Sequence, residues 1–332
     1  MLQPISLEPL DALEVRLLVD NQCDLLLRSE ERAVRPTLAA PDADRPPVMV
    51  EAPVFLDPRL PEMLIAEHGF SVLVTATRAG RARSILFDAG LSAGGLAHNM
   101  SALQLSLADV EAIVLSHGHF DHIGGLSGLL HDAGRRGMPM LLHPDAWLRR
   151  RVAPPNAKPF ELPTPSRAAL EGAGFNVIDD RSPSLLLDGG LLITGEVDRT
   201  TDFERGFPVH QAHRGGDWSP DPLILDDQAL IANVRDRGLV IVTGCGHAGI
   251  VNIVRHARAL TGETRVHAII GGFHLNGPAF AASIGPTVAA LAEFAPSMIV
   301  PGHCTGWDAA VAIAAAMPAA FVQGSVGTRF VL

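Results

Sequence analysis

A run of six residues directly after a short apolar segment restricts the fold of this chain more than any other feature of its sequence. The segment 110–115 is apolar and β-prone, and Ser116 leads from it into His117-Gly118-His119-Phe120-Asp121-His122. Three imidazoles and one carboxylate therefore occupy a single short turn, in which histidines two residues apart can face one ion. Asp121 and His122 then project toward a neighbouring position, so the turn can supply ligands to two adjacent metal ions. The sequence predicts a strand that ends at a dinuclear metal centre.

The last third of the chain repeats one pattern three times, in which an apolar strand is followed by glycine and histidine. The predicted strands are 239–243, 266–270 and 298–300, and helices are predicted at 248–260 and 279–294. The histidines that follow the three strands are His247, His274 and His303. Ligands of open α/β sheets collect beyond the carboxyl ends of the strands. These three histidines are therefore expected to converge at one edge of a sheet.

The rest of the chain alternates between short predicted strands and two irregular segments. Further strands are predicted at 14–19, 70–77, 84–87, 110–115 and 138–142, a hairpin at 185–194 and a helix at 97–105. Residues 28–61 and 152–165 are rich in proline, which removes backbone donors and interrupts regular structure. A long irregular segment in a domain of this size is either a functional lid or a flexible insertion. Both interpretations of residues 28–61 stay open.

Composition restricts the class of protein and its partners. The chain has 332 residues, of which 47% are hydrophobic, so a globular protein with a large core is expected. Its net charge of −10 disfavours nucleic acids as partners, although a small anionic substrate can still bind at a positive metal site. Neither a membrane span nor a signal peptide is expected. With only three cysteines, a reducing cytoplasm is the expected location. A homo-oligomer stays open.

The metal-binding turn also resembles a known family. His-x-His-x-Asp-His at 117–122, with Phe87-Asp88-Ala89-Gly90 upstream, is similar to the motifs of the metallo-β-lactamase superfamily. The resemblance is greater to one branch, the dihydropterin-methyl-aminobenzene-phosphate synthase-like hydrolases. The matching segments run in family order along nearly the whole chain: 19–21, 67–69, 115–119, 194–199, 244–253, 271–275 and 303–306.

This resemblance implies a fold and two sets of metal ligands. The fold would be an α/β (α+β) four-layer αβ/βα sandwich, with two mixed sheets face to face, helices on the outer faces and the metals at one edge. The whole chain, 1–332, would form one such domain. The first metal ion would be held by His117, His119 and His247. The second would be held by Asp121, His122 and His303.

Several further residues are candidates for the site. Cys245 stands where many relatives have a bridging aspartate, and it is either a thiolate ligand or a small buried residue. His274 is a metal ligand, a catalytic or substrate-binding residue, or structural. Asp88 is expected to accept the free N–H group of a ligating histidine and so to fix its tautomer. The resemblance also suggests four pocket residues, each of which could equally be a solvated loop residue: Asp20, His68, Glu196 and Arg199.

The remaining histidines lack the sequence context of a strand followed by glycine. They are interpreted as non-functional, and His256, in a predicted helix beside two arginines, is expected to be exposed. The others are His98, His131, His143, His210, His213 and His267.

Two divalent transition-metal ions are the expected cofactors, and zinc is favoured over iron or manganese. The principal hypothesis is a hydrolase whose metal-bridging hydroxide attacks a small phosphorylated or ester-like metabolite. Asp121 would orient the water, and His274 would protonate the leaving group. One alternative is a pterin-type synthase like the namesake of the branch. The other is a non-catalytic metal-binding scaffold.

Overall fold

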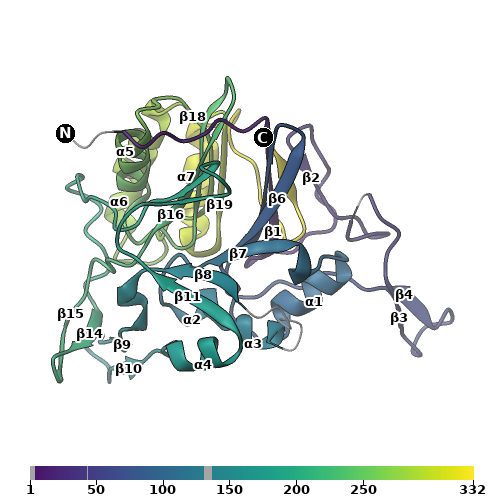
Figure 1. The fold of residues 1–332 in the computed structure, drawn as a ribbon, viewed down its shortest axis with the longest axis horizontal. Helices are drawn as coiled ribbons and strands as arrows, with labels where there is room; N and C mark the ends of the chain where they lie inside the picture. Colours follow the sequence, from purple (N-terminus) through teal and green to yellow (C-terminus); the bar gives the residue numbers. More distant parts are fainter. Residues whose placement is uncertain (1–3, 43, 131–136) are drawn as a thin grey trace.

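Two β-sheets lie face to face with helices on their outer sides, as a computed structural model shows for residues 4–42, 44–130 and 137–332 (Figure 1). Buried side chains from both sheets, such as Val74 and Val240, form one core between them. Two further apolar clusters join each sheet to its own helices. The predicted αβ/βα sandwich is therefore confirmed.

The first sheet has eight strands in the order β11-β8-β7-β6-β5-β1-β20-β2. Strands β6, β7, β8 and β11 pair in parallel, and the other pairs are antiparallel. The bounds are β1 (Ala12–Val19), β2 (Ala33–Val34), β5 (Ser71–Arg78), β6 (Arg81–Phe87), β7 (Val110–Val114), β8 (Met138–Leu142), β11 (Phe175–Asp179) and β20 (Arg329–Val331).

The second sheet has six strands in the order β12-β13-β16-β17-β18-β19, of which the last three are parallel. Along β17, Val240 and Val242 pack into the core between the sheets, whereas Leu239 and Ile241 pack toward the helices. Burial on both faces explains why this strand is a continuous apolar run. The bounds are β12 (Ser184–Leu186), β13 (Leu191–Ile193), β16 (Ala229–Val234), β17 (Gly238–Thr243), β18 (Val266–Gly272) and β19 (Met298–Gly302).

The helices cover the outer faces of the sandwich. Helices α5 (Ile250–Thr261), α6 (Ala281–Glu293) and α7 (Trp307–Ala316) pack on the second sheet. Helices α1 (Gly95–Ala102), α3 (Leu126–Leu129) and α4 (Arg167–Gly172) pack on the first. One-turn elements are α2 (Phe120–Ile123) and the 3₁₀ helices η1 (Leu107–Asp109), η2 (Pro144–Trp147) and η3 (His303–Thr305). None of these helices, within the part of the chain that the structure describes, has the length and apolar character needed to cross a bilayer.

A small four-stranded sheet was not expected from the sequence. It consists of β9 (Arg150–Val152), β10 (Phe160–Glu161), β14 (His210–Arg214) and β15 (Asp217–Pro220), in the order β10-β9-β14-β15. The prediction of an uninterrupted loop over 152–165 is therefore wrong at β10. Strands β9 and β14 are rich in arginine and histidine, and the buried Arg150 forms ion pairs with Asp221 and Asp226. Apolar periodicity could not reveal such strands.

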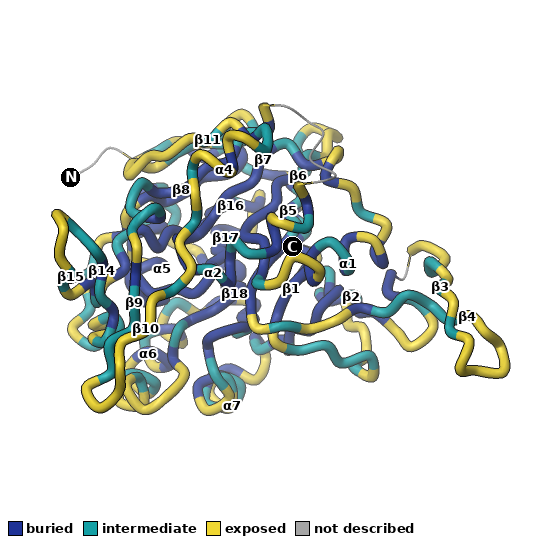
Figure 2. Tube along the Cα trace, turned by 90° about the horizontal axis from the view of Figure 1, so that it is seen from below, coloured by how far each residue is buried: buried dark blue, intermediate teal, exposed yellow. Residues whose placement is uncertain are grey.

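The proline-rich segment at 28–61 contributes one strand to the first sheet and contains a separate two-stranded sheet. Strand β2 pairs with β20, and β3 (Met49–Glu51) pairs with β4 (Arg59–Pro61) in a hairpin. This hairpin projects beyond α1 and is exposed at its tip (Figures 1 and 2). In both views it lies away from α2. The lid or flexible insertion expected at 28–61 and the single-domain organisation stay predictions.

Candidate metal centre

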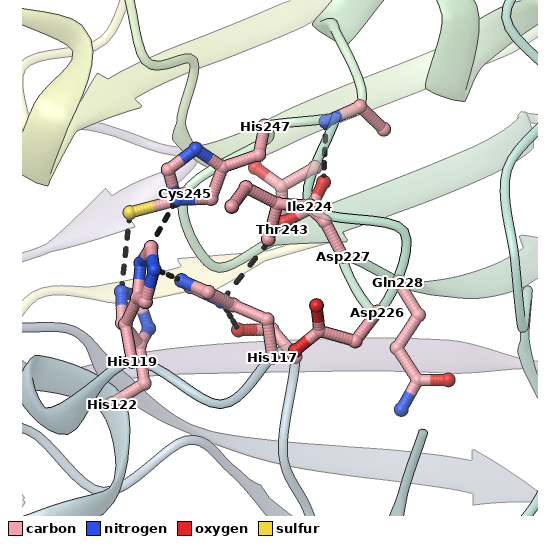
Figure 3. Close-up of polar contacts among 12 residues, drawn as sticks. His117, His119, His122, Ile224, Asp226, Asp227, Gln228, Thr243, Cys245 and His247 are labelled. Atoms are coloured by element: carbon pink, nitrogen blue, oxygen red, sulfur yellow. Dashed lines mark hydrogen bonds and ion pairs between the residues drawn. The ribbon is translucent and has the colours of Figure 1, made fainter. Parts of the chain in front are cut away.

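The first group of ligand atoms comes from two separate turns at strand ends. His117 and His119 follow β7, and His247 follows β17 (Figure 3). His119 Nδ1 lies 3.0 Å from His117 Nε2 and 3.2 Å from His247 Nε2. A tetrahedral zinc ion about 2.0–2.1 Å from each nitrogen requires nitrogens about 3.3 Å apart. The spacing of the three imidazoles therefore fits a common cation.

The second group adds carboxylate and sulfur to imidazole. Asp121 and His122 lie in α2, Cys245 follows β17 and His303 follows β19. His122 Nε2 lies 3.2 Å from Cys245 Sγ, and Asp121 Oδ2 lies 3.3 Å from His303 Nε2. The four ligand atoms lie within 4.8 Å of one another. His303 Nε2 is buried without a hydrogen-bond partner in the described residues, as expected of an atom that would bind a metal ion.

The two groups adjoin, since the rings of His117 and His122 have centroids 4.3 Å apart. Burial and neighbouring imidazoles hold the pKa values of His117, His119 and His247 well below the usual histidine range. A metal ligand must be deprotonated, so these neutral imidazoles are prepared to bind. The residues present therefore fit a dinuclear metal centre.

Asp88 supports the second group from behind. Its carboxylate accepts hydrogen bonds from the Ser116 backbone N–H at 2.6 Å and the Ser116 hydroxyl at 2.7 Å, and it lies 2.7 Å from His122 Nδ1. Burial disfavours the charged form of His122, but Asp88 and Asp121 outweigh that effect and raise its pKa to about 9. A Cβ at Gly244 would lie 2.1 Å from the Ser116 hydroxyl oxygen, so only glycine fits between the two turns.

Burial and neighbouring charges shift the pKa values of Asp121 and Cys245. Burial raises the pKa of the Asp121 carboxyl, but His122 and His303 outweigh it and hold that pKa well below its usual range. Burial raises the pKa of the Cys245 thiol. A cation would therefore find the carboxylate ionised but would have to displace a proton from sulfur.

Three further candidates, His274, His68 and Asp20, lie beside the metal centre. The ring centroid of His274 is 4.0 Å from that of His247, and its φ of 45° is a strained conformation for a residue other than glycine. His68 is largely exposed, and its Nε2 lies 3.5 Å from Asp121 Oδ2. Asp20 lies behind His303 and accepts a hydrogen bond from its backbone N–H at 2.7 Å.

Glu196 and Arg199 contact residues outside the two ligand groups, and their roles as pocket residues stay predictions. Glu196 faces His143 at 3.8 Å and Arg181 at 3.6 Å. The guanidinium group of Arg199 donates to the backbone carbonyls of residues 223 and 224. Arg199 also interacts electrostatically with Asp227, whose Oδ1 lies 4.0 Å from His117 Nδ1.

The sequence did not reveal two buried aspartates that hold the ligand turns. Asp226 accepts from Gly118 N at 2.8 Å and pairs with Arg150, whereas Asp227 accepts from Ala248 N at 2.8 Å (Figure 3). Burial raises the pKa of Asp227 to about 6. Each carboxylate therefore fastens one of the turns that carry the first group. The sequence signal that could have indicated them is the pair Asp226-Asp227 just before the apolar strand β16.

His210 was interpreted as non-functional, but it borders the first group. Its ring centroid lies 5.1 Å from that of His119 and 5.9 Å from that of His247. Burial lowers its pKa to about 4. It was missed because β14 was not predicted. His256 is buried rather than exposed, beside Asp198, and His131 lies outside the described residues.

A cavity of about 560 Å³, here called the His274 cavity, opens beside the first group. His247 and His274 form one end, and its walls include Phe203, Phe273 and Phe280. Arg205 contributes a cationic side chain to the same lining. This volume suits a small organic molecule that reaches the metal centre.

The fold and ligand groups define a class, and comparison with known proteins agrees with it. A family model described as the metallo-β-lactamase superfamily matches residues 65–303. The chain therefore belongs to the metallo-β-lactamase superfamily, as the sequence motifs predicted.

Individual relatives and solved structures resemble the chain over most of its length. The 7,8-dihydropterin-6-methyl-4-(β-D-ribofuranosyl)-aminobenzene-5'-phosphate synthase of Methanocaldococcus jannaschii is 31% identical over 252 residues, which cover 74% of this chain and 83% of the relative. A crystal structure of a metal-dependent hydrolase of the β-lactamase superfamily matches with a TM-score of 0.68 and 22% identity, over 96% of this chain and 98% of that one. The metallo-β-lactamase fold protein YhfI from Bacillus subtilis matches with a TM-score of 0.51 and 12% identity, over 97% and 100% of the two chains. The two structures support the fold alone.

Proposed function

We propose that this protein is a dinuclear metal-dependent hydrolase that acts on a small phosphorylated or ester-like metabolite. The observation that carries the proposal is the pair of adjoining ligand groups, one of three imidazoles and one of mixed donors. Zinc is the favoured ion, because imidazole with thiolate and carboxylate is a donor set typical of zinc and not of magnesium or calcium.

Some residues of the site would bind the metal ions, and others would act on the attacking water. His117, His119 and His247 would hold the first ion, and the second group would hold the other. When bound, two such ions lower the pKa of water and neutralise negative charge that develops on the substrate. Asp121, next to both His122 and His303, is positioned to orient the attacking water. When the metal displaces the proton from His122 Nε2, Asp88 would accept the Nδ1–H group and so fix the tautomer that binds the metal.

The His274 cavity is the proposed seat of the substrate. Its phenylalanine side chains would exclude water from the reacting centre, and Arg205 offers a positive charge to a phosphate or carboxylate group. His274 lies between this cavity and His247, where it is positioned to donate a proton to the leaving group.

The alternative is a pterin-type synthase, which the identity of 31% to the synthase of Methanocaldococcus jannaschii favours. A synthase would need room for two reactants at the same centre, and the ligand groups do not discriminate between the two reactions. The non-catalytic scaffold is less well supported, because both ligand groups have all their donors.

Metal analysis and hydrolysis of bis(p-nitrophenyl) phosphate test the proposal together. The purified protein, expressed with ample zinc, should hold close to two ions per chain and cleave the diester. Replacing both His117 and His119 by alanine should abolish cleavage, whereas His213→Ala, at a half-buried histidine in β14, is the matched control and should cleave normally. A metal-free protein, or a double variant with full activity, would refute the hydrolase.

A second assay separates hydrolase from synthase. The protein is incubated with a pterin diphosphate donor and an aminobenzene ribose phosphate acceptor, and the mixture is analysed by mass spectrometry. A coupled product would favour the synthase, and its absence alongside diester cleavage would leave the hydrolase. Two bound ions with neither reaction would favour the scaffold.

A further inference from the structure

A second cavity lies behind His303, and the metal chemistry does not account for it. This cavity, here called the Trp307 cavity, has a volume of about 550 Å³. It lies between η3, the start of α7 and the loop after β1, and the His303 side chain is itself not exposed. The volume lies within the range of about 300–1,000 Å³ that is typical of small-molecule sites.

The lining of the Trp307 cavity divides into an apolar wall and a polar wall. The apolar wall consists of Trp307, with 76% of its surface exposed, and Ala310, Val311, Ala314 and Phe321. The polar wall includes Asp20, His303, Thr305 and the carboxamides of Asn21, Gln22, Asn276 and Gln323. Among the residues that the structure describes, no lysine or arginine lines this cavity. An anionic ligand is therefore disfavoured here, in contrast to the metal centre.

Asp20 is the one carboxylate of this lining, and only 3% of its surface is exposed. Its Oδ1 accepts hydrogen bonds from Asn21 N at 2.8 Å and His303 N at 2.7 Å. Its Oδ2 receives no hydrogen bond from the residues that the structure describes. A Cβ at Gly302 would lie 2.9 Å from Oδ2, and one at Gly324 would lie 3.7 Å away. Because both positions are glycine, neither carries a side chain that could cover this acceptor.

We propose that the Trp307 cavity binds a small molecule with a flat ring that carries an amidine-type pair of N–H groups. The N–H pair would donate to Asp20 Oδ2 and to the neighbouring carboxamide oxygens, where a charge-assisted bond is strong. The ring would lie against the indole of Trp307, which attracts planar cations. This site is distinct from the substrate site in the His274 cavity and does not rest on the proposed function.

Benzamidine is a suitable probe, because it has the ring and the N–H pair and, as a cation, does not bind metal ions. Isothermal titration calorimetry with the metal-loaded protein should show saturable binding with a Kd below about 1 mM. Acetophenone, which has the same shape without N–H donors, should bind at least tenfold more weakly.

Three variants locate the binding site. Asp20→Asn can keep both backbone contacts of Oδ1 but replaces the free oxygen by a donor, so benzamidine should bind about tenfold more weakly or worse. Ala310→Leu fills the cavity and should abolish binding. Ala315→Leu, at an exposed position of the same helix that is not part of the lining, is the matched control and should bind as the wild type does.

Three outcomes would overturn the proposal: no saturable binding to the wild type, equal binding of acetophenone, or undiminished binding to Ala310→Leu. The last would place the probe elsewhere. This experiment measures binding and not catalysis. Failure of benzamidine to bind would therefore not affect the hydrolase proposal, and absence of hydrolysis would not affect the proposal of a ligand site in the Trp307 cavity.

Discussion

Replacing Asp88 by asparagine is a direct test of the metal centre. Of the four ligands in the second group, Asp88 contacts only His122. Its Oδ1 accepts from Ser116 N, and its Oδ2 lies 2.7 Å from both the Ser116 hydroxyl and His122 Nδ1. In Asp88→Asn the amide oxygen can keep the backbone bond, so the NH₂ group then faces His122 Nδ1. The imidazole must accept there and carry its proton on Nε2, the atom that would bind the metal.

The expected loss follows from these contacts. A hydrogen bond to a charged group contributes about 1.5–3 kcal/mol, and loss of such a support costs roughly 10–100-fold in metal affinity. We therefore expect the second ion to bind 10–100-fold more weakly, about 1.4–2.7 kcal/mol. The first group keeps its three ligands. At limiting free zinc the count should fall from two ions per chain to one.

The measurement is metal content after dialysis against zinc buffers of known free concentration. Asp188→Asn is the matched control, because Asp188 has a φ of 56° against 59° at Asp88, and its side chain is 81% exposed. Asparagine tolerates this left-handed conformation, so neither variant should be strained. An Asp88→Asn protein that holds two ions with wild-type affinity would refute the assigned support of His122.

Three more predictions concern proton release on metal binding, the thiolate ligand and the packing of a glycine. Because the pKa of His122 is raised to about 9 and that of the Cys245 thiol is raised by burial, both carry protons at pH 7.5 in the metal-free protein. Zinc uptake should release at least two protons per chain, one from each of these ligands, and a further proton where a metal-bound water ionises. Calorimetry in buffers of different ionisation enthalpy measures the number, and no release would contradict the ligand assignment. Cobalt-loaded protein should show a thiolate charge-transfer absorption. The Cys245→Ser variant should lose this absorption, and the Cys304→Ser control should keep it. If the absorption remained in Cys245→Ser, Cys245 would be excluded as a ligand. Gly128→Ala would place a Cβ 1.7 Å from a backbone carbonyl oxygen and should lower the free energy of unfolding by about 2 kcal/mol or more, whereas Gly172→Ala, with nothing within 4 Å, should be neutral or slightly stabilising in urea titrations.

Much of the fold could be predicted from local pattern. The strand at Met138–Leu142 was predicted with the bounds that it has, and α5 and β17 to within two residues, because their apolar runs are bounded by glycine and histidine. Strands β9 and β14 could not be predicted. Their residues are stabilised by ion pairs and by neighbouring strands, and such contacts leave no periodic trace in the sequence.

The sequence by itself determined which side chains could bind metal, because ligand chemistry and position after a strand are local properties. The turn at 117–122 and the strand–glycine–histidine pattern at His247 and His303 are complete in the primary structure. The order of strands in the two sheets decided which of these turns adjoin, and so which donors share a group. Cys245, His247 and His274 form a third candidate group that overlaps the other two.

Only the tertiary structure placed the supporting residues. Asp226 and His210 reach the centre from a loop and a strand that carry no motif. The physical reason is that burial and hydrogen-bond partners depend on which distant segments meet. In this fold the packing of the two sheets brings those segments to one edge.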